Sequence, residues 1–184
     1  YVDLGIEESF YPIDQFSIMG WVYVDITNRA LSEQRTFVQH NGSQDDKRIW
    51  LGSYQSKYGF MVRTDQNSNI MYNAHNGELA LSEIPLTEGW HHIAAIFTSD
   101  RMELYVDGVL DQNIVEFDSP ATISEFDGSE WHISELYGGA GALYGKVDEF
   151  SFWNKILSFE EISSYMNNSL VGNEDGLAHY FNFN

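Results

Sequence analysis

The sequence predicts an all-β fold, in which two antiparallel sheets pack as a sandwich and one short helix lies near the C-terminus. Three observations lead to this prediction. Short segments with apolar residues at alternate positions recur along the chain, which is the pattern of half-buried strands. Gly is plentiful, with 15 residues, and aromatic residues make up 15% of the chain, as expected of a sandwich with many turns. One segment near the C-terminus carries the start signals of a helix.

The predicted strands follow one another with polar or Gly-bearing turns between them. Segment 16–24 (FSIMGWVYV) places the small Gly20 on the same face as larger apolar residues. Segment 90–98 (WHHIAAIFT) is apolar on both faces, which predicts an inner strand. The dipeptide Asp107-Gly108 lies between two further strands and predicts a hairpin with a two-residue turn. The other predicted strands are residues 1–6, 36–40, 49–54, 59–64, 69–73, 102–106, 109–110, 131–136, 146–153 and 178–184.

The predicted helix begins where the alternation of the last long strand ends. Ser158 can act as N-cap, and Glu161 three residues later completes a capping box. Leu157 and Ile162 stand at the two positions of a hydrophobic staple. Ile162, Tyr165 and Met166 then form one apolar stripe of the helix.

The length of 184 residues fits one domain, spanning residues 1–184, that is large enough to bury a core. No linker, repeat or low-complexity segment interrupts it. The chain opens on Tyr1 within a strand pattern and shows no signal peptide, so we expect it to be excised from a larger protein. No apolar run approaches membrane length, which argues against membrane insertion.

Charge and cysteine content exclude several classes of function. The formal net charge is −19, so nucleic acid and anionic membrane surfaces are poor partners. The carboxylates either solubilise the surface or hold cations, of which Ca²⁺ is the first candidate because it prefers several oxygen ligands. The absence of Cys excludes disulfides, thiolate metal sites and Cys nucleophiles, and it favours a bacterial extracellular origin.

Five segments, in this order, resemble the laminin-G-like and pentraxin-like jelly rolls of the concanavalin A-like lectin/glucanase superfamily. They are FSIMGWVYV, GWHHIAAIFT, YVDG, VDEFSFWNKILSFEEI and the closing GLAHYFNFN, and together they span nearly the whole chain. The resemblance implies a domain that binds glycans, often with Ca²⁺, in a secreted or cell-surface protein. One fold hosts many kinds of site, so the fold alone does not identify the site residues.

The resemblance also implies where calcium would bind. Asp45 and Asp46, in the loop NGSQDDK, match the position of an acidic pair that supplies calcium ligands in pentraxins. The second group of pentraxin ligands would fall in residues 134–144, where only Glu135 is acidic, so one ion is the most that the resemblance implies. Independently of the resemblance, adjacent carboxylates in a Gly-containing loop can converge on one ion. The alternative is that the two Asp side chains solvate a turn.

Aromatic residues predict where a sugar would bind, because exposed Trp and Tyr rings stack on the apolar C–H faces of sugars while polar neighbours bind the hydroxyls. Trp50 and Tyr54 share one face of their predicted strand. The alternative is that Trp and Tyr fill the core of the sandwich. The predicted ligand-binding residues are Trp50, Tyr54, Arg63, Asn73, His75, Trp131 and Tyr137.

Catalysis is not predicted. Retaining glucanases of this superfamily carry two carboxylates on one strand as ExDxxE, about 5–5.5 Å apart, and no such run occurs here. Asp148 has the parity of Phe150 and Phe152 and is expected to point inward, with His92 as a hydrogen-bonding partner rather than a metal ion. Two functions stay open: a calcium-assisted glycan-binding or adhesion module of a bacterial surface or secreted protein, and a protein-interaction domain without a sugar site.

Overall fold

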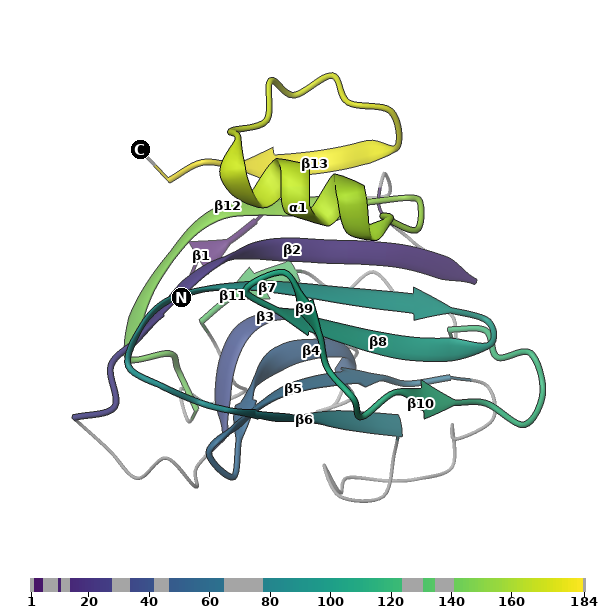
Figure 1. The fold of residues 1–184 in the computed structure, drawn as a ribbon, viewed down its shortest axis with the longest axis horizontal. Coiled ribbons are helices and arrows are strands. Elements are labelled where there is room, and N and C mark those ends of the chain that lie inside the picture. Colours follow the sequence, from purple (N-terminus) through teal and green to yellow (C-terminus); the bar gives the residue numbers. More distant parts are fainter. Residues whose placement is uncertain are drawn as a thin grey trace.

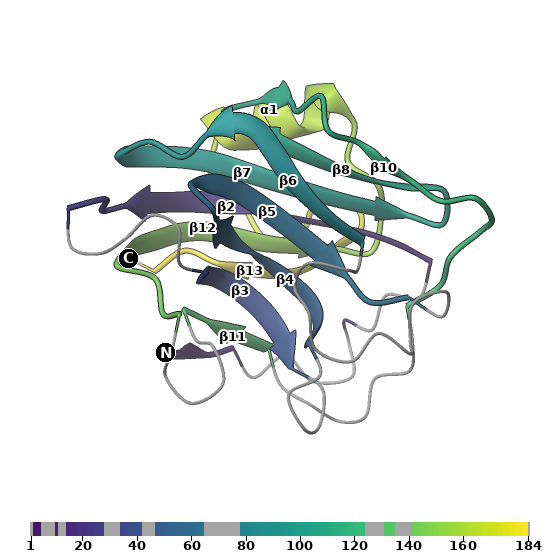
Figure 2. The same ribbon diagram turned by 90° about the horizontal axis from the view of Figure 1, so that it is seen from below.

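A computed structural model describes residues 2–4, 10, 14–27, 34–41, 47–64, 78–123, 131–134 and 141–183. These residues form two antiparallel sheets that pack face to face (Figures 1 and 2). Sheet A contains, in spatial order, β1 (Val2–Asp3), β11 (Trp131–Ile133), β3 (Arg35–Asn41), β4 (Lys47–Tyr54), β5 (Lys57–Val62) and β6 (Glu78–Pro85). Sheet B contains β10 (Val115–Glu116), β8 (Arg101–Val106), β7 (Gly89–Thr98), β2 (Gln15–Val24), β12 (Gly145–Trp153) and β13 (Leu177–Phe181), and β9 (Val109–Leu110) pairs with β8. The predicted fold class is confirmed.

Most predicted strands are confirmed, with small changes at their ends. The predicted inner strand is β7, which lies between β2 and β8. The strand β6 was not predicted, because its sequence ELALSEIP has a weak alternation and ends in Pro. The predicted strand 69–73 lies outside the described residues.

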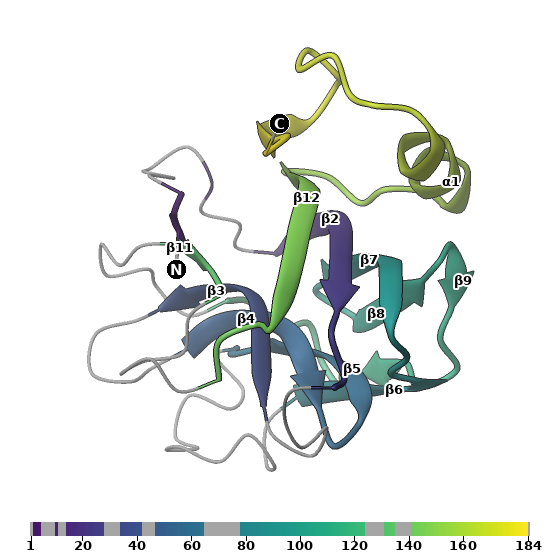
Figure 3. The ribbon, with the colours of Figure 1, turned by 90° about the vertical axis from the view of Figure 1, so that its left-hand side faces the viewer.

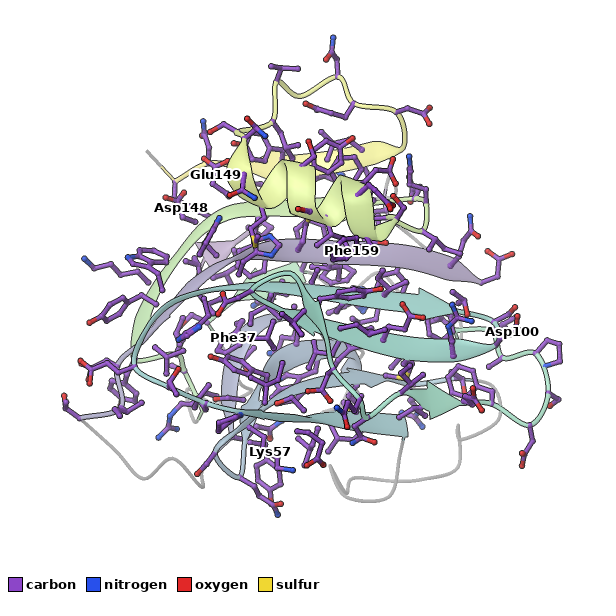
Figure 4. All side chains as sticks on the ribbon, viewed as in Figure 1. Phe37, Lys57, Asp100, Asp148, Glu149 and Phe159 are labelled. Atoms are coloured by element: carbon purple, nitrogen blue, oxygen red, sulfur yellow. The ribbon has the colours of Figure 1, made fainter. Side chains whose placement is uncertain are left out.

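The space between the sheets is filled by one apolar core, built largely from aromatic rings. Trp131 lies 5.3 Å from Phe10 and 5.1 Å from Phe152 between ring centroids. Figure 4 shows Phe37 in this interior, and its side chain is fully buried. Gly20 faces the core as predicted, and a Cβ there would come within 2.5 Å of the ring of Phe150. The glycine therefore makes room for an aromatic ring on the neighbouring strand.

The helix α1 (Phe159–Asn167) packs on the face of sheet B that points away from sheet A (Figure 3). The capping box is confirmed, since Ser158 accepts from the backbone N–H of Glu161 and the Glu161 side chain accepts from that of Ser158. Leu157 and Ile162 are both buried in the cluster beneath the helix, as a hydrophobic staple requires. The helix thereby covers the part of the outer face of sheet B that contains Met19, Ala94 and Trp153.

The predicted hairpin is also confirmed. Asp107 and Gly108 have φ values of 51° and 76°, the left-handed conformation that a two-residue hairpin turn needs at both central positions. The Asp107 carboxylate accepts a hydrogen bond from the backbone N–H of His92 at 2.8 Å and contacts Nδ1 of His91 at 2.8 Å. The turn is therefore tied to the start of β7.

A β-bulge in β12 corrects the predicted orientation of Asp148. Asp148 pairs with Trp21 and Ser151 pairs with Met19, so Glu149 and Phe150 together oppose the single residue Gly20. Glu149 has a φ of 53°, and this extra residue reverses the alternation of the strand. Phe150 and Phe152 keep their places in the core, but Asp148 lies on the outer face with Trp21 rather than pointing inward.

Candidate functional site

The predicted sugar-binding face is the outer face of sheet A, and the structure corrects its central residue. Trp50 does share this face with Tyr54, since Ile49 and Leu51, on either side of Trp50, point into the core. Its indole packs against two glycines: a Cβ on Gly52 would lie 2.5 Å from the ring, and one on Gly59 would lie 2.8 Å from it. The ring is only 1% exposed, so it offers no face to a sugar in this structure.

Trp131 is the second correction. It lies on β11 opposite His40 and points into the core, where its exposure is 0%. The side chain fills the space between the sheets with Phe10 and Phe152, so it does not flank a ligand. Trp50 and Trp131 are thus both packed in the interior, as expected if Trp side chains fill the sandwich rather than bind a sugar.

Of the other predicted ligand-binding residues, the structure describes Tyr54 and Arg63. Tyr54 and Arg63 are partly exposed. Asn73, His75 and Tyr137 lie outside the described residues, so their part in a sugar site stays a prediction.

The predicted calcium ligands Asp45, Asp46 and Glu135 also lie outside the described residues. Their described neighbours are anchored at different places along β3. Lys47 pairs with Asn41 at the end of the strand, whereas the backbone N–H of Ser134 donates to the carbonyl of Phe37. These anchors are four residues apart, about 13 Å along a strand. Within the described ranges, no group of three or more His, Asp or Glu side chains could hold a metal ion.

Exposed aromatic side chains gather instead on the outer face of sheet B, beyond the helix. The unbroken pairing of β2 with β7 places Tyr23 beside Trp90, and Trp21 beside His92. The ring centroids of Tyr23 and Trp90 lie 5.8 Å apart, with their planes at 70°. Trp90 is 43% exposed and Tyr23 is partly exposed. We call Tyr23 and Trp90 the aromatic corner.

Charged side chains of β12 lie beside the aromatic corner. Lys146 on β12 is exposed and lies across from Tyr23. Asp148 lies two residues further along β12, across from Trp21, and is partly exposed. Figure 4 shows Asp148 and Glu149 on the part of β12 to the left of α1, and the Glu149 carboxylate accepts a hydrogen bond from the hydroxyl of Tyr180. An aromatic face bordered by an ammonium and a carboxylate can stack on a sugar ring and bind its hydroxyls.

His92 is the buried polar residue beside this surface. Its imidazole meets the ring of Trp21 nearly edge-on, with centroids 5.4 Å apart. The side chain is buried, and neither ring nitrogen has a hydrogen-bonding partner in the described part of the chain. Burial lowers the pKa of His92 from its ordinary value of 6.5 to about 4, and the nearby charge of Asp107 opposes this only partly. The imidazole is therefore neutral at pH 7.

The sequence contained one signal for the aromatic corner. Trp21 and Tyr23 alternate with residues of the core face in segment 16–24, so both were bound to lie on the opposite face. The alternation of segment 16–24 did not predict which part of this face the helix would cover. Whether α1 covers these two residues depends on tertiary packing, and the structure places the helix over Met19 and Ala94 instead.

The sequence matches the family model for the concanavalin A-like lectin/glucanases superfamily, Laminin_G_3, over residues 1–163. The chain belongs to this superfamily. No curated protein matches it. No helix in the described ranges is long and apolar enough to cross a membrane.

Similar solved structures show the same fold at low sequence identity. A candidate carbohydrate-binding protein from Bacteroides ovatus is 16% identical, with a TM-score of 0.65, over 99% of this superfamily member and 47% of the Bacteroides protein. This member thus spans about half the length of that protein. The sialidase carbohydrate-binding module CBM40 from Ruminococcus gnavus, solved with α2,3-sialyllactose, is 13% identical with a TM-score of 0.58, over 88% and 91% of the two chains. Domain 4 of an extracellular GH43 arabinanase from Geobacillus stearothermophilus, solved with arabinotriose, is 13% identical with a TM-score of 0.57, over 86% and 69%.

We predict that His92 makes the domain sensitive to acid. Because the folded state binds this proton only near pH 4 and the unfolded state binds it near 6.5, the unfolded state holds more protons in between. The free energy of unfolding should therefore fall as the pH drops from 6.5 to 4, by about 3 kcal/mol from this group. In His92→Phe this part of the loss should be absent, as measured by urea unfolding at several pH values. Equal losses in both proteins would contradict the assignment.

Proposed function

We propose that this chain is a non-catalytic carbohydrate-binding module of a secreted or cell-surface bacterial protein. The observation that carries the proposal is the aromatic corner, a pair of accessible rings on an ordered sheet with an ammonium and a carboxylate beside it. Rings held by two paired strands lose little freedom when a ligand stacks on them. Support also comes from two domains of the same fold whose structures contain arabinotriose and sialyllactose.

The buried carboxylates of the described residues support a binding rather than a catalytic role. Glu103 accepts hydrogen bonds from Nε of Arg101 at 2.5 Å and from the hydroxyl of Tyr105 at 3.2 Å. Asp111 accepts from three backbone N–H groups at 2.9–3.1 Å, two of them on β6 in the opposite sheet. Glu103 is paired with side chains of its own strand β8, and Asp111 ties the segment after β9 to β6. Neither carboxylate borders the aromatic corner.

We also propose that one Ca²⁺ ion assists the module, with Asp45 and Asp46 as its main ligands. Two adjacent carboxylates and the carbonyl groups of a Gly-containing loop match the oxygen ligands that Ca²⁺ prefers. Glu135 is the least supported ligand. Its neighbour Ser134 is bonded to β3 at Phe37, about 13 Å along the strand from Asn41, where Lys47 pairs after Asp46.

The glycan proposal is tested by binding to an array of poly- and oligosaccharides, before and after Trp90→Ala. Loss of the exposed indole should weaken binding at least about 10-fold, which corresponds to about 1.4 kcal/mol. Phe159→Ala is the matched control, since Phe159 is also an exposed aromatic residue, 56% accessible, but lies on α1. A blank array together with specific binding to a protein would instead support a protein-interaction domain.

The calcium proposal is tested by thermal unfolding with millimolar Ca²⁺ and with a chelator. A ligand present at 100 times its Kd stabilises the folded state by about 2.7 kcal/mol, so the melting temperature should rise by several degrees. The paired change Asp45→Asn and Asp46→Asn should abolish the rise, whereas Glu135→Gln should leave most of it. An unchanged melting temperature of the native chain would remove the calcium proposal.

A further inference from the structure

We infer that the aromatic corner binds one uncharged sugar ring, at a chain end or a branch, rather than an acidic sugar or a long run of polysaccharide. This inference rests on the glycan-binding function proposed above and specifies its ligand. It follows from the angle between the two rings and from the charges around them.

The ring geometry limits how much of a glycan the site can contact. The planes of Tyr23 and Trp90 lie at 70° to one another, with centroids 5.8 Å apart. A sugar ring stacked on one of them therefore meets the other as a side wall. Coplanar rings would extend one flat surface under consecutive sugars, whereas two rings in edge-to-face contact offer a stacking face to only one. The corner thus favours a residue that can be approached from its end or side.

The charges beside the corner disfavour an anionic ligand. Asp148 lies on the outer face near Lys146, and Glu88 is exposed two residues before Trp90. These two carboxylates outnumber the ammonium of Lys146, in a chain with a formal net charge of −19. At 8 Å in water each carboxylate repels an anion by about 0.5 kcal/mol, so the single Lys146 does not offset them. A neutral sugar carries no net charge and does not incur this cost.

His92, which is buried beside the aromatic corner, adds no positive charge to it. The imidazole of His92 is neutral at pH 7 and packs beneath the edge of Trp21. His91, on the opposite face of β7, is turned toward Asp107 and the hydroxyl of Thr87. Neither histidine therefore presents a cation that could pair with the carboxylate of an acidic sugar.

The test uses an array that holds neutral oligosaccharides and their sialylated or uronate-bearing counterparts in matched pairs. The intact domain should bind neutral members at least about 10-fold more tightly than acidic ones, and Trp90→Ala should lose that binding. The variant Glu88→Gln should bring the affinity for acidic members closer to that for neutral members, while leaving neutral binding within about 2-fold. The monosaccharide found at the bound chain end should inhibit within about 10-fold of the oligosaccharide.

The outcomes separate the inference from the function on which it rests. Preferential binding of acidic glycans through Trp90 would overturn the inference and leave the proposed function standing. Affinity that rises more than about 100-fold with chain length would overturn the single-ring part of it. An array with no bound glycan would overturn the proposed function, and the inference with it.

Discussion

The pairing of β2 with β7 is the constraint on which the rest of the molecule depends. Ten consecutive residues, from Gln15 opposite Thr98 to Val24 opposite Gly89, pair without a shift in register. This pairing sends one set of side chains into the core and the other set to the outer face of sheet B. A slip of one residue would exchange the two sets, so the core, the seat of the helix and the aromatic corner are all fixed by one register.

The bulge in β12 adapts the third strand to this register. Opposite Gly20, β12 uses two residues where β2 uses one, which allows Phe150 to fill the space above the glycine. The same extra residue turns Asp148 outward, beside Trp21. A feature that completes the core thus also places a carboxylate next to the aromatic corner, and β-bulges are known to re-aim side chains in this way.

Much of the fold could be predicted from the sequence, because its signals are local. Strand alternation, the Asp107-Gly108 turn and the capping box at Ser158 depend on residues close together in the chain, and all three are confirmed. The errors arise where distant segments decide the outcome. The orientation of Asp148 depends on a bulge opposite Gly20, and the burial of Trp50 depends on Gly52 of its own strand together with Gly59 of the neighbouring strand. Parity along a single strand contains neither piece of information.

The superfamily defines the fold, and the exposed surface defines what this particular domain can bind. Among the five Trp residues, Trp50, Trp131 and Trp153 are buried, Trp21 is partly exposed and Trp90 is 43% exposed. An uncharged oligosaccharide that stacks on the aromatic corner must therefore change the surroundings of one indole far more than those of the three buried ones. The most direct measurement is an NMR titration of the five indole N–H signals with a neutral oligosaccharide. The signal of Trp90 should shift most, followed by that of its neighbour Trp21, while those of Trp50, Trp131 and Trp153 stay in place. A shift at Trp50 with none at Trp90 would contradict the account.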